Sequence, residues 1–438
     1  MFHIRSFVAG CAALLLAAAA PAADKPPFPR LGGVNIGGQH NYEDSAYQAK
    51  LAKLDIAVLG YWPGWDDSHH TTMERVVRNI KAINPDTQIF LYQNSMQVDL
   101  SAAAVADLRA KVDQMRWWAY ASGSSGDRIL SNFAVKQGKQ IYVTNTTLFT
   151  PRDGNGYQWW EYHARWAVNN YYKPNPSIAG LYEDNVFWRP RIEADWNRDG
   201  VIDPAKGTNA GKWLREGYRA RFQLMRQLMP GKYVIGNLAD WGQKDAVLTE
   251  LDGTLHGGII EGVMGSSHSP EKWASWAEMM RWYRKTMAAV AEPQLVIFHH
   301  DSTDATNYQE MRYGLASCLM DDAYYAYTHN HVYGGVTWFD EFDAQLGQAI
   351  QPPQTAPWQK GVYRRDFEKG IALVNPRGNG PVEVELEEEF KRIAGKQAPT
   401  VNNGQTARRI QLKDRDGIIL LRINSKALPT APKLIAVH

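Results

Sequence analysis

The sequence has little cysteine and almost no net charge. It has 2 Cys in 438 residues, which excludes a small domain stapled by disulfides. Its 48 basic residues are almost matched by 46 acidic ones, and this balance argues against nucleic-acid binding, which needs clustered positive charge. Beyond the N-terminus, no apolar run is long enough to span a bilayer. We therefore expect a large globular protein without a nucleic-acid partner or a membrane span, and a monomer.

The N-terminus has the pattern of a secretory signal peptide. Arg5 precedes an apolar stretch over residues 7–20, and Ala20-Pro21-Ala22 forms a small-x-small cleavage site. We predict that residues 1–22 are removed and that the protein is exported, to the periplasm or the medium. The mature chain then keeps only Cys318, and the apolar stretch around it predicts a buried packing residue.

Tryptophan is unusually abundant, with 16 Trp beside 21 Tyr and 13 Phe. An aromatic excess is compatible with a large core. It also suits a protein that stacks aromatic rings on the apolar faces of sugars.

Short apolar, β-rich runs alternate with longer helical stretches, which predicts buried parallel strands joined by helices. Eight such units predict a (β/α)8 TIM barrel, class α/β, over residues 30–350. An open doubly wound sheet is the alternative, although no Gly-rich phosphate fingerprint follows any of the runs. The predicted strands are residues 31–38, 54–60, 87–94, 178–186, 232–238, 257–263, 294–301 and 333–340.

Two further segments extend the predicted barrel. Residues 95–177 are too long for one crossover, so we expect an insertion that walls the cleft, with its Trp pairs packing it onto the barrel. After the proline-rich linker 351–357, short alternating strands and Gly-containing turns predict a small C-terminal all-β sandwich over residues 358–438, docked on the barrel.

Active sites of such barrels lie where the strands end. Two carboxylates meet this condition most clearly: Glu261 after an apolar, glycine-flanked run, and Asp184 in GLYEDN. Strand alternation places Tyr182 and Asp184 on one face, and we expect Leu181 and Glu183 to face the helices. Glycosidic cleavage needs such a pair of acids, with Glu261 predicted as general acid and Asp184 as nucleophile or base. The alternative is that either acid is a structural partner of a buried Arg or Tyr.

Other polar and aromatic residues at the predicted strand ends are candidates for binding substrate. The adjacent pair His299-His300 invites a metal interpretation, but neighbouring strand residues point in opposite directions and no HxxxH or HExxH spacing is present. We expect no catalytic metal. The predicted substrate-binding residues are Trp62, Tyr92, Asn94, Asn237, His299, Trp338, Asp340 and Glu341.

The segment DWNRDGVID resembles a calcium-binding loop of EF-hand type. Oxygen-bearing side chains occupy positions 1, 3, 5 and 9, namely Asp195, Asn197, Asp199 and Asp203, and Gly200 occupies position 6. Position 12 is Lys206, which cannot be a ligand. We predict a structural calcium ion here, and a polar turn without metal is the alternative.

Several motifs together resemble a known family. They are GLYEDNVFW, DWNRDGVID, IIEGVMG and TWFDEFDAQLG, followed by GVYRRDFEKGIALVNPRG. In these the chain is similar to the bacterial hypothetical glycosyl hydrolase family 15, over residues 31 to 380. The resemblance implies a TIM barrel with acids after strands four and six, which fall on Asp184 and Glu261, and it implies no substrate.

The sequence thus predicts an exported glycoside hydrolase that cleaves an O-glycosidic bond in a polysaccharide or oligosaccharide. One alternative is a sugar-binding protein on a barrel without catalysis. The other is a metal-dependent polysaccharide deacetylase. Turnover of a glycan panel distinguishes the first, and chelator-sensitive release of acetate the second.

Overall fold

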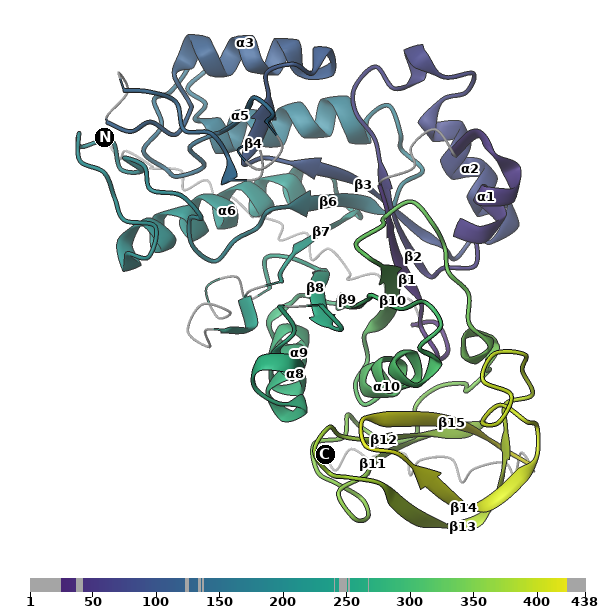
Figure 1. Ribbon diagram of the computed structural model, residues 1–438. Helices are drawn as coiled ribbons and strands as arrows, with labels where there is room; N and C mark the ends of the chain where they lie inside the picture. Colours follow the sequence, from purple (N-terminus) through teal and green to yellow (C-terminus); the bar gives the residue numbers. More distant parts are fainter. Residues whose placement is uncertain are drawn as a thin grey trace, which may run out of the picture.

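The computed structural model of the protein describes residues 25–36, 42–122, 126–132, 135, 138–239, 241–243, 250, 253–266 and 268–423. The predicted signal peptide, residues 1–22, lies outside the described residues. Figure 1 shows a large barrel-containing part, drawn from purple to green, and a small β part, drawn from green to yellow.

The large part is built on one sheet of eight parallel strands in chain order. A parallel bridge between Leu31 and Tyr325 joins the last strand to the start of the first and closes the barrel. The predicted α/β barrel is confirmed. The strands are β1 (Gly32–Asn35), β2 (Ile56–Gly60), β3 (Gln88–Asn94), β6 (Gly180–Asp184), β7 (Tyr233–Asn237), β8 (Gly257–Met264), β9 (Leu295–Ser302) and β10 (Tyr324–His329).

The prediction of the eighth strand at residues 333–340 is wrong. The strand is β10, whose aromatic run YYAYTH pairs with β9 from Tyr324 to His329. Residues 333–339 form an irregular segment, in which the Gly335 carbonyl accepts a hydrogen bond from the Asn35 side chain of β1 at 2.9 Å. Gly334 and Gly335 disfavour a strand here, because glycine weakens strand interiors.

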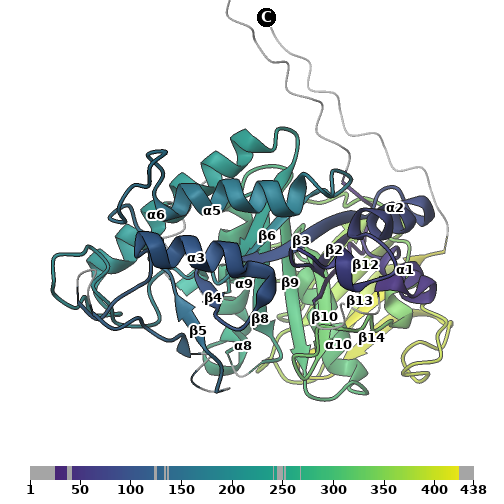
Figure 2. The ribbon, with the colours of Figure 1, turned by 90° about the horizontal axis from the view of Figure 1, so that it is seen from above.

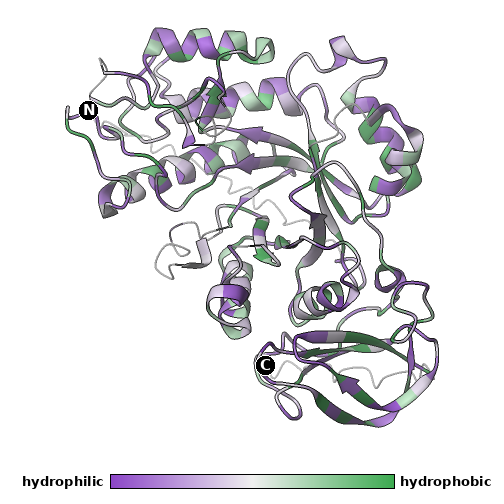
Figure 3. Ribbon diagram, viewed as in Figure 1, coloured by the Kyte–Doolittle hydropathy of each residue, from purple (hydrophilic) through white to green (hydrophobic). Residues whose placement is uncertain are grey.

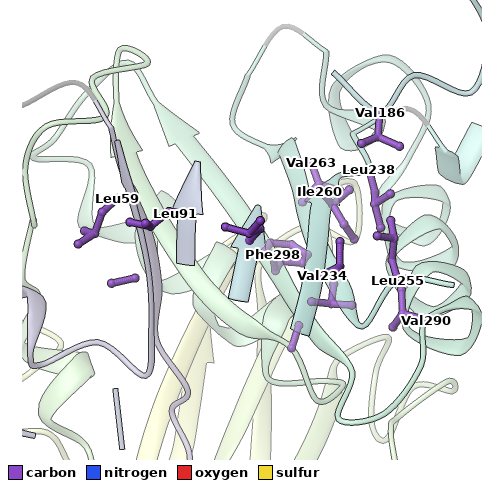
Figure 4. Packing of buried hydrophobic residues seen from close by; sticks show 14 of the residues in the cluster. Leu59, Leu91, Val186, Val234, Leu238, Leu255, Ile260, Val263, Val290 and Phe298 are labelled. Carbon is purple, nitrogen blue, oxygen red and sulfur yellow. The ribbon is translucent and has the colours of Figure 1, made fainter. Parts of the chain in front are cut away.

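Side chains alternate between the two faces of the barrel strands and so divide its core. The interior is filled by a cluster that includes Val58, Phe90, Tyr182 and Ile259. The outer face packs against the helices, and Figure 4 shows Leu59, Leu91, Val234, Ile260 and Phe298 in this layer. The alternation matters for the site, because it decides which strand-end side chain enters the barrel mouth.

Helices surround the barrel, and their starts are capped as the sequence pattern leads one to expect. Thr72, Ser275 and Asn307 each accept a backbone N–H three residues further on, at the starts of α2, α9 and α10. The helices are α1 (Ser45–Leu51), α2 (Met73–Ile83), α3 (Ala106–Met115), α5 (Trp159–Ala167), α6 (Thr208–Leu228), α8 (Pro270–Trp273), α9 (Trp276–Ala289) and α10 (Tyr308–Cys318).

The insertion between β3 and β6 carries α3, α5 and a two-stranded sheet of β4 (Gln97–Asp99) and β5 (Ile141–Val143). In Figures 1 and 2, α3 lies beside α5, and the Trp166 indole donates a hydrogen bond to Asp107 at 2.9 Å between them. Trp117, Trp118 and Trp159 are buried. Their ring contacts lie within the insertion, Trp117 with Trp159 and Trp118 with Tyr142, so their packing of the insertion onto the barrel stays a prediction.

The C-terminal part is a five-stranded antiparallel sheet in the order β11-β12-β15-β13-β14. It curls so that β13 and β14 face β11 and β12, and it encloses its own apolar cluster (Figure 1). Figure 3 shows the polar and apolar banding along β13, as expected for strands with one wet face. The strands are β11 (Tyr363–Phe367), β12 (Gly370–Asn375), β13 (Val382–Arg392), β14 (Thr406–Leu412) and β15 (Asp416–Arg422).

The sheet is docked firmly on the outside of the barrel. Arg312 of α10 forms an ion pair with Asp416 of β15 at 3.3 Å, and both side chains are at most 10% exposed. Arg365 of β11 is buried and donates to the backbone carbonyls of Leu319 and Asp321 at 3.1 and 2.7 Å. Buried charged contacts of this kind fix the relative position of two modules.

Two simpler expectations concern the described residues. Cys318 is buried, as predicted, and burial raises the pKa of its thiol. No helix within the described ranges is both long and apolar enough for a bilayer crossing.

Candidate active site

A cavity of about 540 Å³ opens at the carboxyl ends of the barrel strands. Its size lies within the range of small-molecule sites. Asp184 ends β6 and Glu261 lies in β8, and both line this cavity. The remaining polar lining consists of Tyr92, Asn94, Gln97, Ser131, Asn132, Tyr182, Asn185, Arg191, Asn237 and Tyr333.

One amide group connects the two acids. The Asn237 Nδ2 donates to Asp184 Oδ1 at 3.1 Å and to Glu261 Oε2 at 2.7 Å. Its Oδ1 accepts the Ala239 backbone N–H at 3.1 Å, which fixes the orientation of the amide. The two carboxylate oxygens are therefore at most about 5.8 Å apart, the sum of the two hydrogen-bond lengths.

Asp184 is deeply placed and surrounded by donors. The Tyr92 hydroxyl donates to Asp184 Oδ2 at 2.6 Å, and the Tyr92 ring stacks on Tyr182 with centroids 5.7 Å apart. Burial raises the pKa of Asp184, and the charge of Glu261 adds to this, while the Tyr92 and Asn237 hydrogen bonds oppose it. The pKa of Asp184 is raised overall, so the ionised side chain lowers the free energy of unfolding.

Glu261, like Asp184, is partly buried, and a tyrosine from outside its own strand holds it. The Tyr333 hydroxyl, from the loop after β10, donates to Glu261 Oε1 at 2.5 Å. Both oxygens of Glu261 thus have a donor, one from Tyr333 and one from Asn237. The carboxylate is fixed in place but remains part of the cavity wall.

The adjacent acid Glu183 points the other way, as the alternation predicts. It is buried against the helices, where it forms an ion pair with Arg221 of α6. Gln93 donates to the same Glu183 oxygen at 2.5 Å. Glu183 is therefore the structural partner of a buried arginine, and Asp184 is the strand-four acid that faces the cavity.

Three of the predicted substrate-binding residues line the cavity, and two lie outside its lining. Asn94 and Asn237 belong to the lining. Tyr92 lines it too, but its hydroxyl is bound to Asp184 and its ring to Tyr182. Trp62 lies outside the lining and packs against the outer core near His69. His299 is fully buried, with Gly262 and Thr328 as partners of its two ring nitrogens.

The prediction that Trp338, Asp340 and Glu341 lie at the barrel mouth is wrong. Trp338 lies over Lys53, which precedes β2 at the opposite end of the barrel, with the ammonium 4.5 Å from the ring centroid. Asp340 accepts the Gln397 backbone N–H at 2.6 Å, and Glu341 accepts from Asn402 at 2.8 Å, both in the C-terminal part. The misplaced eighth strand caused the error, because these residues follow an irregular segment and no barrel strand.

Sequence reasoning missed Tyr333 for the same reason. In the incorrect assignment it begins a strand, whereas it lies in the loop that returns over the cavity. The signal was the Gly334-Gly335 pair beside it, which favours a loop.

The insertion borders the cleft, as the sequence predicted: Met96, Gln97 and Val143 form part of the cavity wall.

A family model described as hypothetical glycosyl hydrolase family 15 matches residues 81–371, which is more than half of the chain. The chain belongs to this family. It is thus a glycoside hydrolase by family, and the two cavity acids lie within the matched range. No curated protein matches the enzyme.

Solved structures are similar to the enzyme at low sequence identity. The glycoside hydrolase domain of PelA from Pseudomonas aeruginosa is 14% identical, with a TM-score of 0.42, over 71% of this chain and 98% of that one. An Anoxybacillus α-amylase is 11% identical, with a TM-score of 0.48, over 90% and 97%. A debranching enzyme from Nostoc punctiforme is 12% identical, with a TM-score of 0.44, over 87% and 88%.

The loop with the calcium-like spacing lies between β6 and α6, and its own side-chain oxygens accept hydrogen bonds within it. The Asp195 carboxylate accepts the backbone N–H groups of Asp199 and Gly200 at 3.1 and 2.7 Å. Asn197 donates to Asp199 at 2.8 Å, and Asp203 accepts the Trp196 N–H at 2.9 Å. Within the described part of the chain, no group of three or more His, Cys, Asp or Glu side chains is arranged to hold a metal. Calcium binding here stays a prediction.

Calcium is expected to raise the melting temperature of the protein, and Asp199→Ala to abolish the rise. An ion that binds only the folded state stabilises it by about 2.7 kcal/mol at a concentration one hundred times its Kd. Melting is measured in calcium and in chelator. Asp304→Ala is the matched control, because Asp304 makes a similar turn with Thr306 outside this loop. Equal melting of the wild type in calcium and in chelator would leave the loop as a turn without metal.

Asp184→Asn is expected to stabilise the fold at neutral pH. The pKa of Asp184 is higher in the folded state than in the unfolded chain, so ionisation of this side chain destabilises the folded wild type. The loss of stability begins as the pH rises above the ordinary pKa of aspartate and is complete above the pKa of the folded state. The amide removes this penalty. The gain in melting temperature should therefore be present at pH 7 and shrink as the pH falls toward about 4. A gain independent of pH, or a loss at pH 7, would contradict the account.

Proposed function

We propose that the enzyme cleaves O-glycosidic bonds of a polysaccharide or oligosaccharide with Asp184 and Glu261 as its two catalytic carboxylates. The observation that carries this proposal is the Asn237 amide, which holds both acids at one cavity. Glycosidases need two such groups flanking the scissile bond.

The short separation favours retention of the anomeric configuration. Retaining enzymes hold their carboxyl groups about 5–5.5 Å apart, and inverting enzymes about 6.5–9.5 Å, to leave room for a water molecule. The two oxygens that share the Asn237 donor are at most about 5.8 Å apart, which is below the range of inverting enzymes. One carboxylate then attacks the anomeric carbon directly, and water later hydrolyses the glycosyl–enzyme ester.

Glu261 is assigned as general acid and Asp184 as nucleophile. Asp184 accepts hydrogen bonds from Tyr92 and Asn237, which oppose the rise in its pKa that burial causes. Glu261 has two donors of the same kind, Tyr333 and Asn237, so azide rescue decides between the two roles. Glu261 forms part of the cavity wall, where it can deliver a proton to the leaving oxygen and recover one from water. Since the pKa of Asp184 is raised, acidification should begin to lower the activity at a pH above the usual pKa of aspartate.

The site of action belongs to the same proposal. The pattern of residues 1–22 supports export, so we place the enzyme in the periplasm or outside the cell. The amide-rich lining, with Asn94, Gln97 and Asn132, supports a hydroxyl-rich ligand.

The test is a panel of purified glycans incubated with the wild type, Asp184→Asn and Glu261→Gln, with release of reducing ends as the readout. Turnover by the wild type alone supports the proposal. Binding of a glycan by all three proteins without turnover by any would instead indicate a sugar-binding protein on a barrel scaffold.

A further inference from the structure

Strand β8 is irregular at the position of Glu261. Ile260 pairs with Phe298 of β9, and the next pair along is Met264 with His300. Three residues of β8, Glu261 to Val263, therefore face one residue of β9, His299. Such a bulge leaves backbone groups without a strand partner and redirects the side chain beside it.

The bulge requires a glycine and leaves one N–H to be satisfied from elsewhere. Gly262 has φ +62°, and a Cβ there would lie 2.5 Å from the Ser266 Oγ. Its backbone N–H, directly after Glu261, donates to the His299 Nδ1 at 2.9 Å. A side chain of β9 thus supplies the hydrogen bond that the ladder cannot make.

The histidine is itself held in one tautomer. Because Nδ1 accepts from Gly262, Nε2 carries the proton and donates to the Thr328 Oγ1 at 2.9 Å. Thr328 in turn donates to Asp301 Oδ1 at 2.6 Å. Asp301 lies 3.2 Å from the Nε2 of the surface residue His331. Burial lowers the pKa of His299, in agreement with a neutral ring.

We infer that His299 is a positioning residue for Glu261, with Thr328 and Asp301 orienting its ring. The inference rests on the proposed function in that it takes Glu261 as the general acid. His299 does not line the cavity, and its two nitrogens are used within the protein, so it acts through the backbone of the bulge. The bulge sets where the Glu261 carboxylate meets Asn237 and Tyr333.

The chain offers a matched control in the next residue. His300 is equally buried but points to the other face, where its Nδ1 meets the Tyr325 hydroxyl at 2.7 Å. Replacing either histidine by leucine removes a buried, hydrogen-bonded ring, so both variants should lose stability. Only the change at residue 299 should displace Glu261.

The experiment compares His299→Leu, His299→Gln and His300→Leu in the full chain. A misplacement of about 1 Å can cost about 10²-fold in rate. We expect His299→Leu to lose about that factor in kcat on the glycan with KM nearly unchanged. Glutamine carries an acceptor and a donor, so His299→Gln should recover most of the rate, and His300→Leu should keep it per folded molecule.

A second readout separates positioning from general damage. A dinitrophenyl glycoside of the released sugar has a leaving group that needs no proton, so the burst of dinitrophenolate, which reports formation of the glycosyl–enzyme, should keep nearly the wild-type rate in His299→Leu. Steady-state turnover should still fall, because Glu261 is the base for the second step. A burst slowed as much as glycan cleavage, or equal kcat losses in the two leucine variants, would overturn the inference.

The position of Glu261 gives a readout that does not depend on activity. A crystal structure of His299→Leu should show the Glu261–Asn237 hydrogen bond broken, while that of His300→Leu should keep it. An unmoved Glu261 in His299→Leu would overturn the inference whatever the substrate. If the wild type cleaves no glycan, the proposed function fails, but the crystal structures still decide the role of His299.

Discussion

Asp184→Asn and Glu261→Gln are each expected to lower turnover by about 10²–10⁴-fold, the usual contribution of a positioned acid or base. Both amides keep the shape of the acid and can still accept a hydrogen bond. Both variants should therefore fold and bind glycan, with Asp184→Asn more stable than the wild type at neutral pH, and the loss should appear in kcat. Initial rates and binding isotherms on a cleaved glycan measure the two quantities separately.

Asp340→Asn is the control for this pair. Asp340 is a carboxylate that the sequence also suggested, but it bonds the backbone of Gln397 away from the cavity, and an amide oxygen can accept the same bond. Its activity should equal that of the wild type. If either cavity variant keeps near-normal activity, the role given to that residue is wrong.

Rescue by azide distinguishes the two roles. In a retaining mechanism, the nucleophile variant leaves a vacancy that azide fills by direct attack, which inverts the anomeric centre. In the acid variant azide attacks the glycosyl–enzyme and returns the original configuration. Asp184→Asn, or the smaller Asp184→Ala, should give the inverted glycosyl azide and Glu261→Ala the retained one. The opposite pattern would exchange the roles of the two acids.

Truncation after Gln354 is expected to give insoluble protein. It removes the whole C-terminal sheet and uncovers the α10 face on which β15 packs so closely that a Cβ at Gly417 would lie 2.6 Å from the Arg312 carbonyl oxygen. It also leaves Arg312 and Glu271 without their partners Asp416 and Arg415. Breaking a buried pair costs about 3–5 kcal/mol, a large part of the stability of a domain.

A chain that ends at Ile423 keeps every described strand of the sheet and is the control for the truncation. Soluble yield and the melting temperature of the two truncated chains give the comparison. A soluble barrel that ends at Gln354 and retains full activity would show that the sheet is dispensable.

The sequence predicted most of the barrel because its strands are local, apolar and separated by clear helices. It failed at the eighth strand, where YYAYTH follows α10 after only a short turn and reads as a continuation of the helix. The pairing with β9 and the bridge from Tyr325 to Leu31 define this strand. Both contacts are long-range, and no local pattern contains them.

The acids were predictable because alternation is a local rule: it separated Asp184 from Glu183 correctly. Their supports were not predictable. Tyr333 depends on the course of a loop after the eighth strand, and the bulge at Gly262 appears only when β8 is aligned with β9. The glycine that follows Glu261 was the single visible sign of it.

The most direct test of the central claim is the configuration of the first product. Proton NMR of a fresh digest, recorded before mutarotation, shows which anomer the enzyme releases from a glycan of known linkage. The shared Asn237 donor, whose two bound carboxylate oxygens are at most about 5.8 Å apart, predicts that the released anomer matches the linkage cleaved. Release of the opposite anomer would contradict the assignment of Asp184 and Glu261 as a nucleophile and acid pair.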